Sequence, residues 1–318
     1  MRVVYDSRAS AIIYNLIKSN INHFKDKQII LPSNICPIVP ISLMKADIDF
    51  IFIDIDRETL CLDHKLLLDF LKTKGPIISC IFYVRTFGYI EDLEVLFNNI
   101  VDNYPNILIV DDRCAGIPDF SLKERTKSHI VLFSTGYAKY VEIGWGGFAF
   151  IDPNIEYNRN ELVFNNGDHE RLIADINASI SKQSIFNYKH NDWLENSIKM
   201  PLERYIDIIL KEIIKVKNHK NQLNAIYREY IPKEISLMDG FQNWRFSLIV
   251  DKKEIILKKI FKTGLFASSH YASISHLFGG QHSVVAEDIH NRIINLFNDF
   301  RFNEEQAIKC AKIVRSNI

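Results

Sequence analysis

The sequence predicts an α/β protein that has a mostly parallel sheet sandwiched by helices and a smaller C-terminal α+β domain. Through the first half of the chain, short apolar segments typical of buried strands alternate with amphipathic segments of helix length. This alternation is the pattern of βαβ units. A polar stretch and then a long helical pattern follow, so we expect a large domain at residues 1–195 and a small one at 196–318.

The expected strands of the first half are short, rich in Ile, Val and Phe, and bounded by polar or turn-forming residues. They are Gln28–Leu31, Ile48–Ile53, Ile77–Phe82, Ile107–Val110, Ile130–Phe133 and Gly147–Ile151. The expected helices between them carry apolar residues at intervals of three and four. They are Ala9–Ile17, Asp63–Leu71 and Ile90–Ile100.

The second half begins with polar, turn-rich sequence at 152–192, which interrupts the strand and helix alternation. A long helical pattern then runs from about Pro201 to Tyr230. The remaining expected elements complete an α+β pattern: strands at Phe246–Val250 and Leu265–Ser268, and helices at Lys252–Lys262 and Asn303–Val314.

Bulk composition excludes several classes of protein. The 318 residues include 39 basic and 39 acidic ones, so no net field attracts nucleic acid or an anionic membrane. No apolar run reaches the length of a membrane helix, and no signal peptide is evident. The five cysteines contain no C-x-x-C pair, which favours reduced thiols. We therefore expect a soluble cytoplasmic protein that binds neither nucleic acid nor membrane.

Lys139 is the candidate catalytic residue. Ser134 follows an expected strand, Lys139 comes five residues later, and the glycine-rich run Gly144–Gly147 comes next. This context is typical of a lysine that forms an internal aldimine with pyridoxal 5'-phosphate (PLP) and then moves the proton at the substrate carbon. The Ser134 hydroxyl can reach the cofactor phosphate, and the glycines allow close approach of the backbone.

Asp112 is the candidate partner of the cofactor ring. The strand at Ile107–Val110 runs into Asp111 and Asp112, and a carboxylate at a strand end can keep the pyridine nitrogen protonated. An aspartate in this position is equally typical of a turn or a helix cap. Because Asp111 and Asp112 are adjacent, the sequence also leaves open which of the two faces the cofactor.

A phosphate cradle is predicted at Ser7–Ser10, at the start of the expected helix and ahead of its pattern Ala11–Leu16. Free amides at a helix N-terminus and serine hydroxyls suit a dianion. The same residues are also typical of an ordinary N-cap, so this prediction depends on its combination with Ser134.

Several blocks, in order, resemble the DegT/DnrJ/StrS family of PLP-dependent sugar aminotransferases. Ser7–Ala11 is similar to the family's Ser-Gly-Thr-Ala-Ala, and the lysine block at Ser134–Gly147 to its lysine motif. The other similar blocks are Leu31–Cys36, Ala46–Asp56, Val84–Gly88 with Asp92-Leu93, Val110–Ala115, Gly264–Tyr271, and Ala286–Phe300 with Asn303–Glu305. The resemblance covers roughly residues 1–150 and 220–318.

The resemblance implies the aspartate aminotransferase-like fold (fold type I), PLP as cofactor, and a homodimer. It also implies transfer of an amino group from an amino acid such as glutamate to a keto sugar, expected to be nucleotide-linked. Lys139 and Asp112 are then catalytic. The implied cofactor contacts are Ser134, Ser7, Arg8, Ala9, Cys36 and Ala115.

Four positions depart from the family pattern. Arg8 replaces the glycine of the phosphate loop, Ala9 its threonine, Ala115 the Gln or His near the ring oxygen, and Ile35 or Cys36 the stacking aromatic. These departures leave two alternatives open. One is a fold type I protein without transaminase activity, acting as a scaffold or regulator, and the other is a PLP-dependent lyase or dehydratase.

Three further groups of residues complete the sequence-based interpretation. Arg85 and Arg113 follow strand ends and can receive a substrate carboxylate or phosphate, although surface ion pairs are the commoner role. The resemblance implies that His270 and Tyr271 face the substrate. His270, His276 and His282 recur every six residues, but this spacing favours no common face and no acidic partner is close in sequence, so we expect no metal site.

Overall fold

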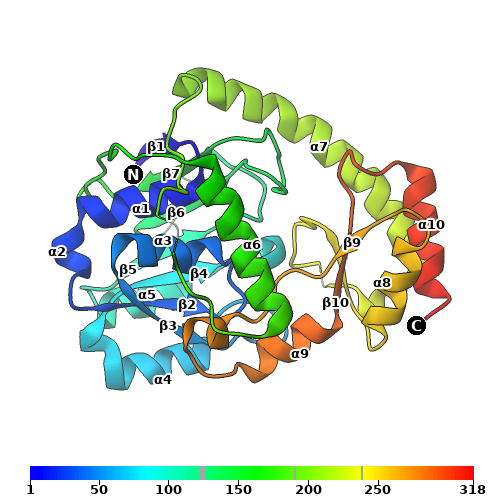
Figure 1. Ribbon diagram of the computed structural model, residues 1–318, viewed down its shortest axis with the longest axis horizontal. Coiled ribbons are helices and arrows are strands. Elements are labelled where there is room, and N and C mark those ends of the chain that lie inside the picture. The colour runs from blue at the N-terminus through cyan, green and yellow to red at the C-terminus, as the bar shows by residue number, and fades with distance from the viewer. Residues whose placement is uncertain (122–126, 190, 238) are drawn as a thin grey trace.

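A seven-stranded sheet forms the larger part of the protein (Figure 1). The structure is a computed structural model that describes residues 1–121, 127–189, 191–237 and 239–318. The strands lie in the order β1-β7-β6-β5-β4-β2-β3; β1 runs in the same direction as β2, β3, β4, β5 and β6, and β7 runs antiparallel to its neighbours β6 and β1. Their bounds are β1 (Arg2–Asp6), β2 (Gln28–Pro32), β3 (Asp49–Ile53), β4 (Ile78–Val84), β5 (Leu108–Asp112), β6 (Ile130–Ser134) and β7 (Gly147–Ile151).

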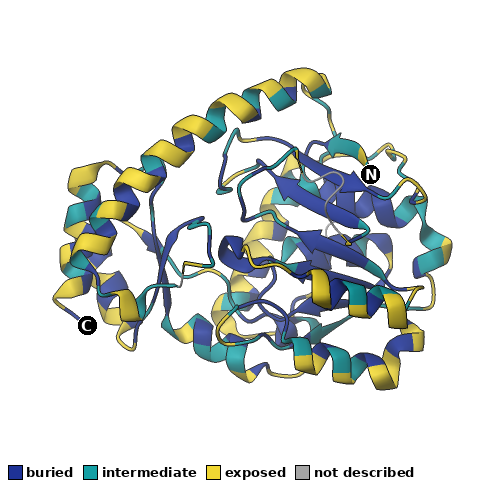
Figure 2. Cartoon of the chain, turned by 180° about the vertical axis from the view of Figure 1, so that it is seen from behind, coloured by how far each residue is buried: buried dark blue, intermediate teal, exposed yellow. Residues whose placement is uncertain are grey.

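Helices cover both faces of this sheet because side chains along each strand alternate between the faces. In β2, Ile29 and Leu31 join a core with three helices: α1 (Ala9–Ser19), α3 (Ile38–Ala46) and α6 (Asn166–Lys182). Ile30 points the other way and joins a core with α4 (His64–Lys74) and α5 (Glu94–Asn103). The strands are accordingly buried while the helices keep an exposed outer side (Figure 2). Short helices connect these elements: α2 (Ile21–Phe24), η1 (Gly75–Ile77) and η2 (Thr86–Gly88).

The C-terminal part contains a small antiparallel sheet in the order β8-β10-β9. Its core packs against α8 and α10, and a capping box between Asn303 and Gln306 begins α10. The bounds are β8 (Phe246–Ile249), α8 (Lys253–Phe261), β9 (Ala267–Ser268), α9 (Val284–Arg292), β10 (Ile293–Leu296) and α10 (Glu304–Arg315), with the short helices η4 (Lys233–Ile235) and η5 (Ser275–Phe278).

Helix α7 (Leu202–Tyr230) connects the two sheets (Figure 1). Tyr205 and Ile209, near its start, pack with the aromatic residues of β6 and β7. Leu223 and Tyr227, near its end, pack in the core of the small sheet. The two parts of the molecule therefore share one continuous helix, and the predicted domain boundary at 195/196 lies just before it.

The predicted fold class is confirmed, including the parallel sheet between helices and the smaller C-terminal α+β region. The polar, turn-rich sequence at 152–192 was not predicted to contain a helix, but α6 occupies Asn166–Lys182 and buries Leu172 and Ile176. The sequence interpretation also missed β1, α3, α9 and β10. Over the described residues, no helix is both long and apolar enough to cross a membrane.

Candidate active site

A cavity of about 570 Å³ opens at the carboxyl ends of the parallel strands β4, β5 and β6. Parallel strands end at one edge of a sheet, which is where α/β proteins bind ligands. Val84, Asp112 and Ser134 are the strand-end residues in its wall. Eight of the predicted site residues line it: Arg8, Ala9, Cys36, Asp112, Ala115, Ser134, Lys139 and Tyr271.

Lys139 and Asp112 lie in this cavity close enough for their charges to interact. Burial disfavours the Lys139 ammonium, but attraction to Tyr271, Cys114, Cys36 and Asp112 outweighs it and raises the pKa of Lys139 above its ordinary value. Burial raises the pKa of Asp112, which the Cys114 amide and Lys139 partly offset. The cavity therefore holds an amine and a carboxyl group that stabilise each other away from water.

The backbone around Lys139 is fixed by two side chains. Ala138 has a positive φ of 57°, which is uncommon for a residue with a Cβ. Its amide donates a 2.8 Å hydrogen bond to the Glu142 carboxylate, and its carbonyl accepts one of 2.6 Å from the Trp244 indole. These two contacts hold the turn that carries Lys139.

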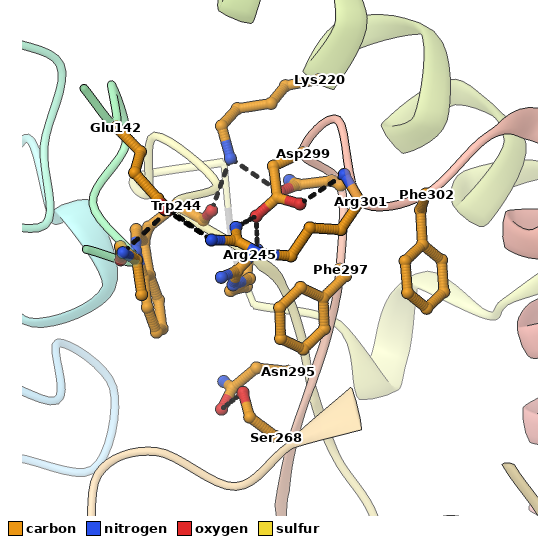
Figure 3. A network of polar contacts seen from close by, with 12 residues as sticks. Glu142, Lys220, Trp244, Arg245, Ser268, Asn295, Phe297, Asp299, Arg301 and Phe302 are labelled. Atoms are coloured by element: carbon orange, nitrogen blue, oxygen red, sulfur yellow. Dashed lines mark hydrogen bonds and ion pairs between the residues drawn. The ribbon is translucent and has the colours of Figure 1, made fainter. Parts of the chain in front are cut away.

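Both contacts continue into a network of charged residues from the C-terminal part (Figure 3). Arg301 donates to both Glu142 oxygens at 2.6 and 2.7 Å and to Asp299 at 2.7 Å. Asp299 also pairs with Arg245. The buried Lys220 donates to the Trp244 carbonyl and to Asn298, each at 2.8 Å. The lysine turn is thus tied to the small sheet by hydrogen bonds and ion pairs.

The N-terminus of α1 forms one wall of the cavity through Arg8, Ala9 and Ser10. The amides of the first turn of a helix have no carbonyl one turn back to accept them. Gly147 permits this arrangement, because a Cβ there would lie 2.6 Å from the Ala9 nitrogen. The site therefore presents backbone donors beside the Ser134 hydroxyl, which suits an anion.

The two adjacent aspartates of β5 have different environments. Asp112 lines the cavity, whereas Asp111 is fully buried and accepts from Arg85 at 2.7 and 3.1 Å and from Arg113 at 2.8 and 2.6 Å. Arg85 and Arg113 line a separate, smaller cavity. The guanidinium groups of these two arginines are therefore engaged in structural ion pairs.

Two other predicted residues also lie outside the cavity lining. The Ser7 hydroxyl is buried and donates to the Glu195 carbonyl. His270 packs beside Trp244, and burial lowers its pKa to about 4. His270 is therefore neutral near pH 7.

The cavity also contains residues that sequence reasoning did not select: Asn34, Thr86, Cys114, Tyr137, His169 and Trp193. Asn34, Thr86 and Cys114 belong to blocks that follow strands, so their position after a strand end was an available signal. His169 and Trp193 lie in and after α6, where the expectation of loop structure concealed them.

From their spacing, His270, His276 and His282 were expected to share no common face. This expectation was wrong for His276 and His282. The rings of His276 and His282 stack at 4.9 Å, and Glu287 lies beside them. The turn between η5 and α9 brings these residues together, which a periodicity argument does not anticipate.

Comparison with known proteins identifies the fold. No family model matches the chain, and no curated protein matches it. Solved structures match it over nearly its whole length. A DegT DnrJ EryC1 StrS aminotransferase from Brucella abortus has 14% identity and a TM-score of 0.70, with 99% of this chain and 86% of that chain covered. The sugar aminotransferase CalS13 from Micromonospora echinospora has 16% identity and a TM-score of 0.70, with 99% and 87% covered. Helicobacter pylori PseC, an aminotransferase involved in the biosynthesis of pseudoaminic acid, has 16% identity and a TM-score of 0.71, with 99% and 86% covered.

Proposed function

We propose that this protein is a PLP-dependent aminotransferase that transfers an amino group from an amino acid, with glutamate as the expected donor, to a nucleotide-linked keto sugar. The observation that supports this most directly is the meeting of Lys139, Asp112 and the N-terminus of α1 in one cavity. These are the amine, the acid and the anion cradle that PLP requires. The fold, which the chain shares with sugar aminotransferases, supports it independently.

The residues present fit the cofactor at each of its ends. The first-turn amides at Ala9 and Ser10, with the Ser134 hydroxyl, would hold the phosphate. Asp112 would face the pyridine nitrogen and keep it protonated. Lys139 would bind the aldehyde carbon covalently. Ala115 and Cys36 line the cavity but cannot make the polar and aromatic contacts that the family pattern has at these positions. We therefore expect Lys139 and the phosphate cradle to supply most of the affinity for PLP.

The catalytic contribution of the chain is control of protons. When bound, PLP supplies an electron sink for the negative charge that develops at the substrate carbon. With PLP and an amino substrate bound, Lys139 would act as the general base that takes the proton from the substrate carbon, and it would deliver that proton to the cofactor's C4′ carbon. The buried carboxylate of Asp112 would balance the positive charge of the protonated pyridine ring.

The proposed substrate class comes from the relatives that share the fold. CalS13 is described as a sugar aminotransferase and PseC as an aminotransferase involved in the biosynthesis of pseudoaminic acid. Tyr137, with 75% of its surface exposed, lines the cavity and is suited to contact a bulky acceptor there. We also propose the homodimer and the two-domain division at 195/196 as features of this enzyme.

Absorbance spectroscopy of the purified protein tests the assignment. Addition of PLP should produce the visible band of lysine-bound PLP, and borohydride should fix the cofactor to the peptide that contains Lys139. Lys139→Ala should abolish both results, whereas Lys65→Ala, at an exposed position on α4, should abolish neither. A band that survives Lys139→Ala would refute the assignment.

Asp112→Asn separates cofactor binding from catalysis. The amide preserves size but cannot balance a protonated pyridine nitrogen, so PLP should still bind while transamination falls by about 10²–10³-fold. Activity measured with glutamate and a nucleotide-linked keto sugar gives the comparison. An unchanged rate would exclude the proposed role of Asp112.

A second candidate function is a scaffold or regulator with this fold but without transaminase activity. The observation that favours it is the ion pair between Arg8, which stands at the phosphate-loop position, and Glu195 at 3.6 Å. Protein that stays colourless with excess PLP would support this candidate. A coloured protein that releases a dehydrated or cleaved amino acid would instead indicate a lyase or dehydratase.

A further inference from the structure

A cluster of two histidines and one glutamate lies where η5, the turn that follows it and α9 meet, outside the cofactor cavity. Ligand atoms of His276, His282 and Glu287 all lie within 4.8 Å of one another. The His282 Nδ1 and a Glu287 oxygen are 2.6 Å apart, and the two imidazole rings stack with an interplanar angle of 5°. None of these three residues takes part in the proposed reaction.

His276 is the most informative member of the cluster. Its surface is only 9% exposed, and neither ring nitrogen has a hydrogen-bond partner among the described residues. A buried polar group without a partner is uncommon in folded proteins. A simple ion pair between His282 and Glu287 leaves this ring unexplained, because His276 takes no part in it.

We propose that His276, His282 and Glu287 bind a divalent transition-metal cation, with Zn²⁺ as the best chemical match. Two imidazoles and a carboxylate are ligands that Zn²⁺ accepts, whereas Mg²⁺ and Ca²⁺ prefer oxygen ligands alone. The cation accepts the lone pair of the buried ring and so provides the partner that His276 lacks.

Binding requires one side chain to turn. In tetrahedral coordination at about 2.0–2.2 Å, two atoms bound to one Zn²⁺ are about 3.3–3.6 Å apart. The His282 side chain is 71% exposed, so it can turn out of its stack on His276 and bring its ring nitrogen closer by about an ångström. Glu287 is 34% exposed, so solvent can supply the remaining coordination position. Burial, and to a smaller extent His282, lower the pKa of His276, which keeps its imidazole neutral and able to bind metal.

The surrounding backbone holds the three ligands in place. The Gly280 amide donates to the Ser275 carbonyl at 3.0 Å and closes the turn after His276. Asp54, after β3, accepts from the Val285 and Ala286 amides at 2.8 and 3.0 Å and fixes the first turn of α9. Asp54, which directly follows β3, therefore positions the α9 side of the site, and the bond between Gly280 and Ser275 holds the turn on the His276 side.

The site is connected to the wall of the cofactor cavity. The Ile274 amide donates to the Ser33 carbonyl at 2.9 Å, and the Ser33 and Ser283 hydroxyls are 2.6 Å apart. Asn34 and Tyr271, which flank these contacts in sequence, line the cavity. We therefore expect the bound cation to stabilise this segment structurally rather than to take part in the chemistry.

Calorimetric titration of ZnCl₂ into tag-free, chelator-treated protein tests the proposal. One equivalent of Zn²⁺ per chain should bind and raise the midpoint of thermal unfolding. His282→Ala and Glu287→Gln, both at partly exposed positions, should leave the fold intact and weaken binding by at least about 10–100-fold. MgCl₂ should produce neither effect.

A matched control uses His219→Gln, because His219 is half-buried on α7 and, among the described residues, its ring nitrogen hydrogen-bonds to the backbone carbonyls of Asp299 and Phe302. This variant should bind Zn²⁺ as the unaltered protein does. Co²⁺ should give a visible ligand-field spectrum that is lost in His276→Ala. Absence of saturable binding, or binding that both His282→Ala and Glu287→Gln leave unchanged, would overturn the proposal.

Discussion

The Trp244 indole nitrogen donates a hydrogen bond of 2.6 Å to the carbonyl of Ala138, the residue that precedes Lys139. Trp244 belongs to the C-terminal part of the chain, two residues before β8 begins, and Ala138 to the loop between β6 and β7. Trp244 also stacks on Tyr271, which lines the cavity. The reactive lysine is therefore positioned by a residue that lies over a hundred positions away in the sequence.

Trp244→Phe should weaken PLP binding and lower stability together. The substitution keeps an aromatic ring but leaves the Ala138 carbonyl without its donor, so the free energy of unfolding should fall by about 1–3 kcal/mol. Urea unfolding and PLP titration measure the two effects. Tyr227→Phe is the control, because it removes a hydrogen bond of 2.6 Å to the Phe297 carbonyl in the small sheet. Equal loss of PLP affinity in both variants would contradict a specific role for Trp244.

Glu142 and Arg301 should show energetic coupling in a double-mutant cycle of Glu142→Gln and Arg301→Met. Their side chains are 26% and 28% exposed, so solvent screens the pair partly and we expect a coupling energy of about 0.5–1 kcal/mol. Urea unfolding of the four proteins gives this value. The coupling should decrease at high salt, and additive single effects would show that the pair contributes nothing.

Lys220 should make stability depend on pH. Burial, and then repulsion from Arg245, lower its pKa to about 7 from the ordinary value of 10.5. Between these two values the unfolded chain binds a proton that the folded protein has released, so this contribution to stability rises with pH, by at most about 1.4 kcal/mol per unit. Below pH 7 both states are protonated and the slope vanishes.

The comparison of Lys220→Met with the unaltered protein isolates this effect. Methionine fills similar space without a charge, so the variant should be the more stable of the two at pH 7. Its advantage should shrink as the pH rises toward 10. Urea unfolding at several pH values measures the difference, and a difference that is constant with pH would show that Lys220 does not titrate in this range.

Gly147→Ala should disturb the phosphate cradle. The added Cβ would lie 2.6 Å from the Ala9 nitrogen and 2.8 Å from its Cα, so α1 must shift. We expect a loss of about 1–3 kcal/mol in the free energy of unfolding and weaker PLP binding. Gly264→Ala is the control, since it has a φ of +80° and no atom within 4 Å of its Cβ position. That variant should lose about 1 kcal/mol through backbone strain while keeping its affinity for PLP.

Strongly periodic or strongly apolar segments were predictable from the sequence. Six strands of the large sheet and helix α7 were located within a few residues. Strands that are buried on both faces appear as short, continuous apolar runs, and a helix that is buried on one side has apolar residues at intervals of three and four. The strand β1 was missed because its apolar run is only Val3, Val4 and Tyr5, which is shorter than the run of four in β3, the other edge strand. Helix α6 was missed because its buried stripe is narrow and its remaining residues are polar.

The candidate site was predictable where its residues follow strands. Asp112 and Ser134 were selected because each stands at a strand end, Lys139 was selected for its position between Ser134 and the run Gly144–Gly147, and all three line the cavity. The contacts of Trp244 and Glu142 with Ala138 were not predictable, since they depend on how distant segments pack. The same limitation explains why the meeting of His276 and His282 was not foreseen.

Helix α7 limits how the small sheet can move relative to the large one. A helix of 29 residues is roughly 43 Å long and resists both compression and stretching. Any opening of the molecule must therefore be a swing about the end anchored by Tyr205 and Ile209, and not a change in separation along the helix axis. Because Trp244 travels with the swinging end, the entrance to the cavity and the orientation of the reactive amine would change in a single motion.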